Sequence, residues 1–255
     1  MIGLRVIAIG WLMQVKMLSR SWFNGVLGVV WPMFFATTAF LMYGSRGSQQ
    51  LISVAVGASL IGIWSSTSTS GASAMQDQRS QGTLELLAAA PAPFAATIAP
   101  ITLAMSTIGI YSMIATLVWG RLLFGISLSV ARPGYFLLGI LVTVLCIGML
   151  GFVLSVSVVR FRTAWAIGNM LEYPVWLICG FLVAPSALPG WVQPFSWVLA
   201  PTWAVRAVRE ATFGGSPLPS LGLALAMTAA YGVGGVLLSH RMLRSARKHA
   251  TLALS

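Results

Sequence analysis

The sequence predicts an all-α integral membrane protein, and three observations support this. Of its 255 residues, 58% are hydrophobic and only 7% are charged, whereas soluble domains carry about 25% charged residues. Six stretches are apolar enough to cross a bilayer as helices. The basic residues lie scattered between these stretches, which suits an anionic lipid surface better than a phosphate groove. Composition therefore excludes a soluble enzyme, a disordered regulator and a nucleic-acid-binding protein.

The first element, residues 1–23, is expected to be an amphipathic helix at the membrane surface. Arg5, Lys16 and Arg20 fall within about 60° of one another at 100° per residue. Most other residues of this stretch are apolar, so the cations can face headgroups while the remaining surface faces acyl chains. The alternative is that the stretch is only the basic flank of the first span.

Six membrane spans follow, because a hydrocarbon core about 30 Å thick needs about 20 apolar helical residues. Each must be helical, since lipid offers no partner to free backbone groups. The expected spans are 25–43, 51–70, 95–119, 135–159, 164–183 and 221–239. The third can continue to Phe124. We expect residues 1–255 to form a single transmembrane domain.

Basic residues predict the orientation, because Lys and Arg concentrate on the cytoplasmic side. With the N-terminus inside, the inner flanks hold ten of them: Arg5, Lys16, Arg20, Arg79, Arg160, Arg162, Arg241, Arg244, Arg247 and Lys248. The outer flanks hold five: Arg46, Arg121, Arg132, Arg206 and Arg209. Both termini are therefore expected in the cytoplasm. Residues 71–94 would face the same side, and residues 184–220 the outside.

The cytoplasmic segment 76–93 is expected to display a short helix. Gly82 can end the helix that extends from the second span, and Thr83 can cap a new one. Glu85 falls in its first turn, where the helix dipole favours a negative charge. Leu84, Leu87 and Ala88 form an apolar stripe, and Pro91 and Pro93 stop the helix. The alternative is an ordinary interhelical loop.

The outer segment 184–213 is expected to contain two short helices that dip into the membrane. Its prolines, among them Pro189 and Pro201, exclude one continuous helix. Its tryptophans, among them Trp191 and Trp203, suit the membrane–water interface. Arg206 and Glu210 are four residues apart and can pair on the second helix. The alternative is an outer loop without regular structure.

The candidate translocation pathway consists of polar and aromatic side chains inside the spans: Ser65, Ser66, Ser68, Thr69, Glu172 and Trp176. An acid inside a span is a functional candidate. Glu172 can also be a structural anchor near Arg160 and Arg162, or a proton carrier. The hydroxyls can instead bond to carbonyls of their own helix.

No catalytic or metal-binding pattern is present in the sequence. It has four acidic residues and two histidines, and it contains neither H-E-x-x-H nor the phosphate-binding G-x-x-x-x-G-K-[ST]. We therefore expect no catalytic residue, no metal and no cofactor on this chain.

Two motifs resemble ABC-2 type transporter permeases. The run Gln81-Gly-Thr-Leu-Glu-Leu-Leu, followed by Ala-Pro, is similar to the coupling-helix motif of that family, with Asp77 and Arg79 at its charged positions in slightly different spacing. The run Pro189-Gly-Trp191 and the later Pro201-Thr are similar to its signature before the last span. The resemblance implies ATPase coupling through Asp77, Arg79, Gln81, Gly82, Thr83, Leu84, Glu85 and Leu87.

The family resemblance also implies partners and an activity. The chain would be the non-catalytic permease of an ABC exporter in a prokaryotic plasma membrane. Two separate ABC ATPase subunits would hold ATP and Mg²⁺, a second permease, identical or different, would complete the pathway, and membrane lipids would surround it. A drug, a lipid or a lipid-linked glycan would suit the spans. The alternative is a proton-coupled secondary exporter that uses Glu172, although such carriers usually show repeated halves.

Overall fold

The computed structural model describes residues 2–20, 22–43, 48–80, 82, 93–126, 129–158, 164–183 and 185–248. Every regular element in these ranges is helical, which confirms the all-α class. The elements are α1 (Ile2–Arg20), α2 (Trp22–Tyr43), α3 (Ser48–Ser80), α5 (Phe94–Phe124), α6 (Pro133–Val158), α7 (Ala164–Ile178), the 3₁₀ turn η1 (Pro185–Ala187), α8 (Gln193–Val198), α9 (Ala200–Phe213) and α10 (Pro217–Lys248).

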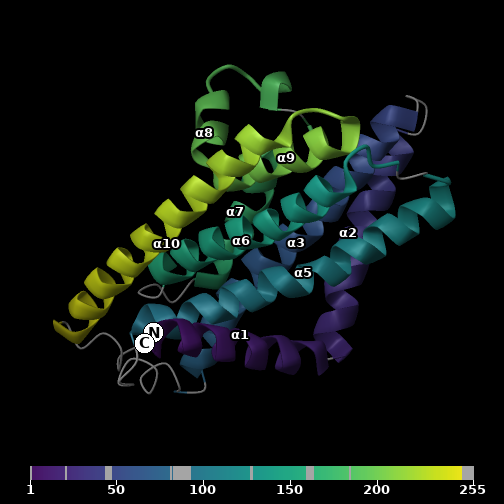
Figure 1. Ribbon diagram of the computed structural model, residues 1–255. Coiled ribbons are helices and arrows are strands. Elements are labelled where there is room, and N and C mark those ends of the chain that lie inside the picture. The colour runs from purple at the N-terminus through teal and green to yellow at the C-terminus, as the bar shows by residue number, and fades with distance from the viewer. Residues whose placement is uncertain are drawn as a thin grey trace.

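The helices form a bundle with two distinct ends (Figure 1). Helix α1 lies across one end, crosswise to α2, and α10 finishes at that end, whereas α8 and α9 occupy the other end. We call these the α1 end and the α8–α9 end. Helix α3 starts at the α8–α9 end and runs back to the α1 end.

Helix α1 confirms the expected N-terminal helix. Its Trp11 indole donates a hydrogen bond to Thr107 Oγ1 at 3.0 Å, so α1 is fixed against α5. Its three cations, Arg5, Lys16 and Arg20, are exposed. Large apolar side chains are exposed as well: Ile9, Leu12, Met13 and Met17. A mixed basic and apolar surface suits the headgroup region, and the location of α1 in a membrane stays a prediction.

Four helices in the described part of the chain are long and apolar enough to cross a membrane. The qualifying stretches are Gln50–Ser68, Phe94–Phe124, Pro133–Ser157 and Pro217–Met242. Helix α2 contributes a shorter apolar stretch, Pro32–Met42. Four of the six expected spans are thus supported by length and composition.

Helix α3 is the centre of the bundle. It packs against α2, α5, α6, α7 and α9. Across 18 residues of its apolar stretch 78% are buried inside the protein, against 22% across 18 residues of the stretch in α10. Leu60, Ile63 and Trp64 have no exposed surface. The second span is therefore the core helix, while α10 leaves most of its surface for lipid.

The expected span 164–183 is wrong at its end, because α7 stops at Ile178. Gly180 adopts a left-handed conformation with φ of 78°, and a Cβ there would lie 2.7 Å from Pro185 Cδ. Glycine adopts this conformation readily. A right-handed helix cannot continue through it. A helix of 15 residues is about 22 Å long, shorter than a bilayer core. Helix α5 does continue to Phe124, as expected.

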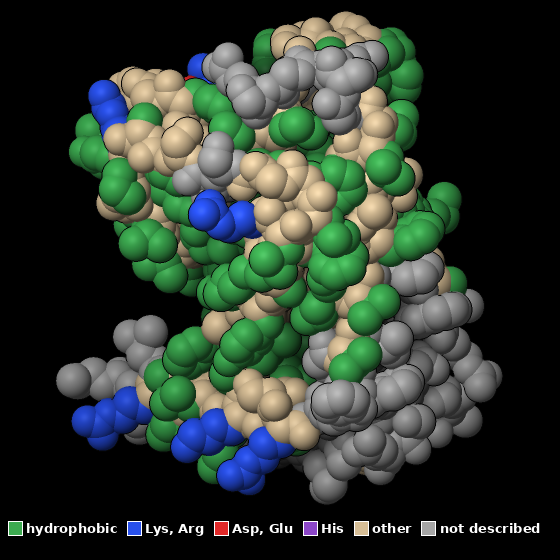
Figure 2. Space-filling view, turned by 90° about the vertical axis from the view of Figure 1, so that its right-hand side faces the viewer, with side chains coloured by type: hydrophobic (Ala, Val, Ile, Leu, Met, Phe, Trp, Pro, Cys, Tyr) green, Lys and Arg blue, Asp and Glu red, His purple; other side chains and the backbone are tan. Residues whose placement is uncertain are grey.

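The surface agrees with a membrane-embedded middle. Figure 2 shows Lys and Arg side chains along one end of the molecule and others toward the opposite end, with a mostly hydrophobic band between the two levels. A band of this kind is expected where acyl chains contact protein.

Candidate functional site

A buried polar contact joins α3 to α7 in the interior of the bundle. The Ser65 hydroxyl donates to Glu172 Oε1, and the Trp64 indole donates to the Glu172 main-chain carbonyl at 3.0 Å. Glu172 is only 7% exposed. Two neighbouring residues of α3 therefore hold one residue of α7 by its side chain and by its backbone.

Glu172 has no cationic partner among the described residues, where the only ion pair is Arg206–Glu210. Arg160 and Arg162, its expected neighbours, lie outside the described residues. The contact seen for its carboxylate is a neutral hydroxyl, in a cluster of apolar side chains that includes Val175 and Trp64. Burying an acid without a cationic partner costs free energy. Such an acid is therefore expected to have a function or to stabilise one conformation.

The hydroxyl stripe of α3 mostly bonds to helix carbonyls. Ser66 Oγ donates to the Ile63 carbonyl at 3.0 Å and reaches the Met105 carbonyl of α5 at 3.3 Å. Ser68 Oγ donates to the Ser65 carbonyl at 3.4 Å. These bonds match the alternative interpretation of the stripe, back-bonding within the helix.

The other candidates for the pathway are Thr69 and Trp176. The Thr69 side chain lies outside the described residues. Trp176 is partly buried beside the core, with its ring 6.3 Å from the Tyr173 ring. The contact between Ser65 and Glu172 brings two of the six pathway candidates together. The role of the six in translocation stays a prediction.

The α8–α9 end contains the two short helices expected between residues 184 and 213, with η1 before them. They are separated at Leu199, whose backbone is extended, and Pro201 stands in the first turn of α9. The Tyr231 hydroxyl of α10 donates to the Val198 carbonyl at 2.6 Å and accepts from the Ala200 N–H at 3.3 Å. One hydroxyl thus satisfies both backbone groups that flank the break.

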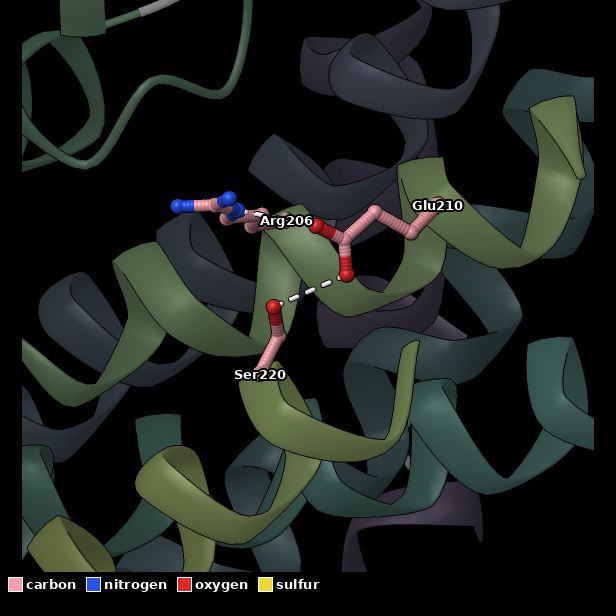
Figure 3. Close-up of polar contacts among 3 residues, drawn as sticks. All are labelled: Arg206, Glu210 and Ser220. Atoms are coloured by element: carbon pink, nitrogen blue, oxygen red, sulfur yellow. Dashed lines mark hydrogen bonds and ion pairs between the residues drawn. The ribbon is translucent and has the colours of Figure 1, made fainter. Parts of the chain in front are cut away.

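A charged cluster ties α9 to α10 (Figure 3). Arg206 Nε donates to Glu210 Oε1 at 2.9 Å, and the Ser220 hydroxyl donates to Glu210 Oε2 at 2.8 Å. The Arg206 guanidinium also lies 5.7 Å from the centre of the Trp203 ring. The expected pair Arg206–Glu210 is confirmed. Glu210 also accepts a hydrogen bond from Ser220 of α10.

Aromatic side chains cover the outside of this end. Trp191 and Trp197 are exposed, as is Phe195. The Pro189 carbonyl accepts a hydrogen bond from the Val192 N–H at 2.9 Å, which forms the turn that presents Trp191. The Trp203 indole donates to the Trp197 carbonyl at 3.0 Å. Exposed indoles of this kind suit a membrane interface.

The expected coupling segment lies mostly outside the described residues. Helix α3 ends at Ser80, and Gly82 has a φ of 68°. The expectation that this glycine follows the end of the helix is therefore confirmed. Asp77 and Arg79 lie in the last turns of α3, and their side chains are not described. Gln81, Thr83, Leu84, Glu85 and Leu87 lie outside the described residues.

Sequence patterns did not indicate three residues that the structure makes important: Gly57, Arg209 and Tyr231. Arg209 donates to the Phe181 carbonyl, and Gly57 lies against the same carbonyl. The signal available for Arg209 is a basic residue on the apolar side of a short helix, next to Val205 and Val208.

The described residues contain no group of His, Cys, Asp or Glu that could hold a metal. The fold, the apolar stretches and the buried polar contact together define a polytopic α-helical membrane protein. The comparison with protein families makes this specific. The ABC-2 type transporter model matches residues 8–213, so the chain belongs to the ABC-2 type transporter family. The comparison with curated proteins finds no match.

Proposed function

We propose that this chain is the permease subunit of an ATP-driven exporter, coupled to its ATPase through residues 81–87. The observation that carries the proposal is the family match over residues 8–213. It is supported by α3, which runs unbroken from the buried contact at Ser65 to Ser80, directly before that segment.

In this proposal two copies of the ATPase subunit bind ATP and Mg²⁺. This chain contributes no catalytic group. A second permease subunit completes the pathway. The α1 end and both termini face the cytoplasm of a prokaryotic cell, and α8 and α9 face outward. A drug, a lipid or a lipid-linked glycan is the class of substrate that suits apolar helices with buried hydroxyls.

The coupling proposal is tested by Leu84→Asp combined with Leu87→Asp. If their apolar stripe fills a groove of the ATPase, two desolvated acids weaken binding strongly, by a mechanism that typically costs a few kcal/mol. Membrane insertion should not change, because the segment lies outside the apolar stretches. The measurement is co-purification of the ATPase with the tagged permease and its stimulated ATP hydrolysis.

Ser216→Asp is the control, since Ser216 is exposed between α9 and α10 and lies outside the apolar stretches. It should leave ATPase binding at the native level. A double variant that inserts normally and still binds and stimulates the ATPase would refute the coupling assignment.

The buried Glu172, whose described partner is a hydroxyl, favours one second candidate: a proton-coupled secondary exporter. Glu172→Gln distinguishes the two. In the first proposal this variant should keep residual ATP-dependent transport. Transport that needs a pH gradient and disappears in Glu172→Gln would support the second.

A further inference from the structure

Arg209 links α9 to the end of α7. Its Nη2 donates to the Phe181 carbonyl at 2.7 Å. Phe181 follows the Gly180 turn, and its N–H bonds to the Trp176 carbonyl at 3.2 Å. The Phe181 carbonyl lies beyond the last helical residue, Ile178, and the Arg209 guanidinium holds it with a charge-assisted hydrogen bond.

Gly57 brings α3 against the same carbonyl. A Cβ added at Gly57 would lie 1.7 Å from the Phe181 oxygen, 2.8 Å from its carbonyl carbon and 3.4 Å from Arg209 Nη2. The first two atoms are backbone and cannot rotate away. Any other residue at position 57 would push α3 away from Phe181.

Keeping Arg209 in this position costs free energy. Its Nε is buried and has no hydrogen-bond partner among the described residues, and no acid pairs with it in the same part of the chain, where the only ion pair is Arg206–Glu210. Burial lowers the pKa of the Arg209 guanidinium, because the charged form loses water. A cation kept under these conditions is expected to act through the contact it does make.

We infer that Gly57, Phe181 and Arg209 form a joint that makes α9 follow α3, with Gly57 and Arg209 as positioning residues for transport. The source of the movement rests on the proposed function, since α3 leads into the coupling segment. α3 cannot slide past Phe181 without a backbone clash, and Phe181 cannot leave α9 without losing the Arg209 bond. A shift of α3 is therefore passed to the helices of the α8–α9 end.

The first test needs no ATPase. Gln50 at the start of α3 and Phe213 at the end of α9 are exposed, and both native cysteines among the described residues are buried. Spin labels on Gln50→Cys and Phe213→Cys report the α3–α9 distance of the full chain in lipid nanodiscs. We expect a narrow distribution for the native joint and a broader, displaced one for Arg209→Met and for Gly57→Ala.

Two variants separate the joint from general damage. Arg209→Lys keeps one charged donor and should restore much of the narrow distribution. A Cβ added at Gly222 would have no atom within 4 Å. Gly222→Ala should therefore give the same distance distribution as the native chain. A native distribution in Arg209→Met would overturn the joint, and this variant decides the question even if Gly57→Ala does not fold.

The second test adds the ATPase and traps it with ATP and vanadate. A label on Leu122, exposed at the end of α5, should change its distance to residue 213, while the 50–213 distance stays constant. In Arg209→Met the ATPase should still bind, and the 122–213 change should be lost. Persistence of that change in Arg209→Met would overturn the positioning role. If no ATPase binds the native chain, the proposed function fails, and the first test still decides the joint.

Discussion

The contact of α9 with α10 and the contact of α3 with α7 both depend on a glutamate, and they hold it in opposite ways. Between α9 and α10, Glu210 receives the Arg206 guanidinium and the Ser220 hydroxyl, one on each oxygen. Between α3 and α7, Glu172 receives the Ser65 hydroxyl and has no ion-pair partner in the described residues.

The difference separates a scaffold from a candidate functional site. The first contact is compensated in charge and hydrogen bonding, so it can fix the turn from α9 into α10 without a ligand. The second keeps an acid in an apolar interior with a neutral partner, an arrangement that is costly and is retained mainly where it serves a function. The α3–α7 contact is therefore the one expected to change when a substrate, a second subunit or a proton binds.

The largest effect is expected for Trp64→Ala in the α3–α7 contact. Trp64 has no exposed surface and anchors the Glu172 backbone, so its removal leaves a cavity and should cost about 3–5 kcal/mol. Denaturant unfolding of the purified protein measures this. The control Trp197→Ala removes an exposed indole and should cost much less. Equal losses would show that the α3–α7 contact is not a stability centre.

Tyr231→Phe comes next and addresses the scaffold side. Losing the hydroxyl leaves the Val198 carbonyl and the Ala200 N–H without their partner, which should cost about 1–3 kcal/mol. Hydrogen exchange at the start of α9 should become faster. Tyr111→Phe changes an exposed tyrosine and should leave both measurements at the native level. Unchanged exchange in Tyr231→Phe would contradict the assigned role.

Glu172→Gln is expected to change stability by about 1 kcal/mol or less, because the amide oxygen can still accept from Ser65. Activity is the sharper measurement. If the carboxylate acts on a ligand or proton, function falls while unfolding stays near native. A large loss of stability would mean that Glu172 is paired as strongly as a structural salt bridge, which would remove the contrast between the two glutamates.

The smallest effect is expected for Arg206→Gln. The Arg206 side chain is 62% exposed, and exposed ion pairs contribute about 0–1 kcal/mol. The loss should shrink further in high salt, because salt screens exposed charges. Unfolding at low and high ionic strength checks this. A loss that salt does not reduce would show that the pair is shielded by membrane.

The sequence predicted those features that depend on residues within about one helical turn of each other. The pair Arg206–Glu210 is one helical turn apart, and the break before Pro201 follows from proline chemistry. The end of α7 was predicted five residues too late, although Gly180 and Pro185 were visible signals. Apolar continuity through residue 183 outweighed them.

Contacts distant in sequence could not be predicted in this way. Ser65 and Glu172 are 107 residues apart, and Tyr231 is 31 residues from Ala200. Nothing in either local pattern specifies the other member. The role of Gly57 depends on a carbonyl brought to it by two other helices. The coupling segment stays a prediction from motif resemblance.

The length of α3 gives the joint a mechanical consequence. At about 1.5 Å per residue, the helix reaches about 34 Å from Gly57 to Ser80 and about 14 Å from Gly57 to Ser48. If α3 moves as a rigid rod, a displacement at Ser80 reaches Gly57 without being reduced. Because the joint makes α9 follow α3, the α8–α9 end would then move by about the same distance as the α1 end.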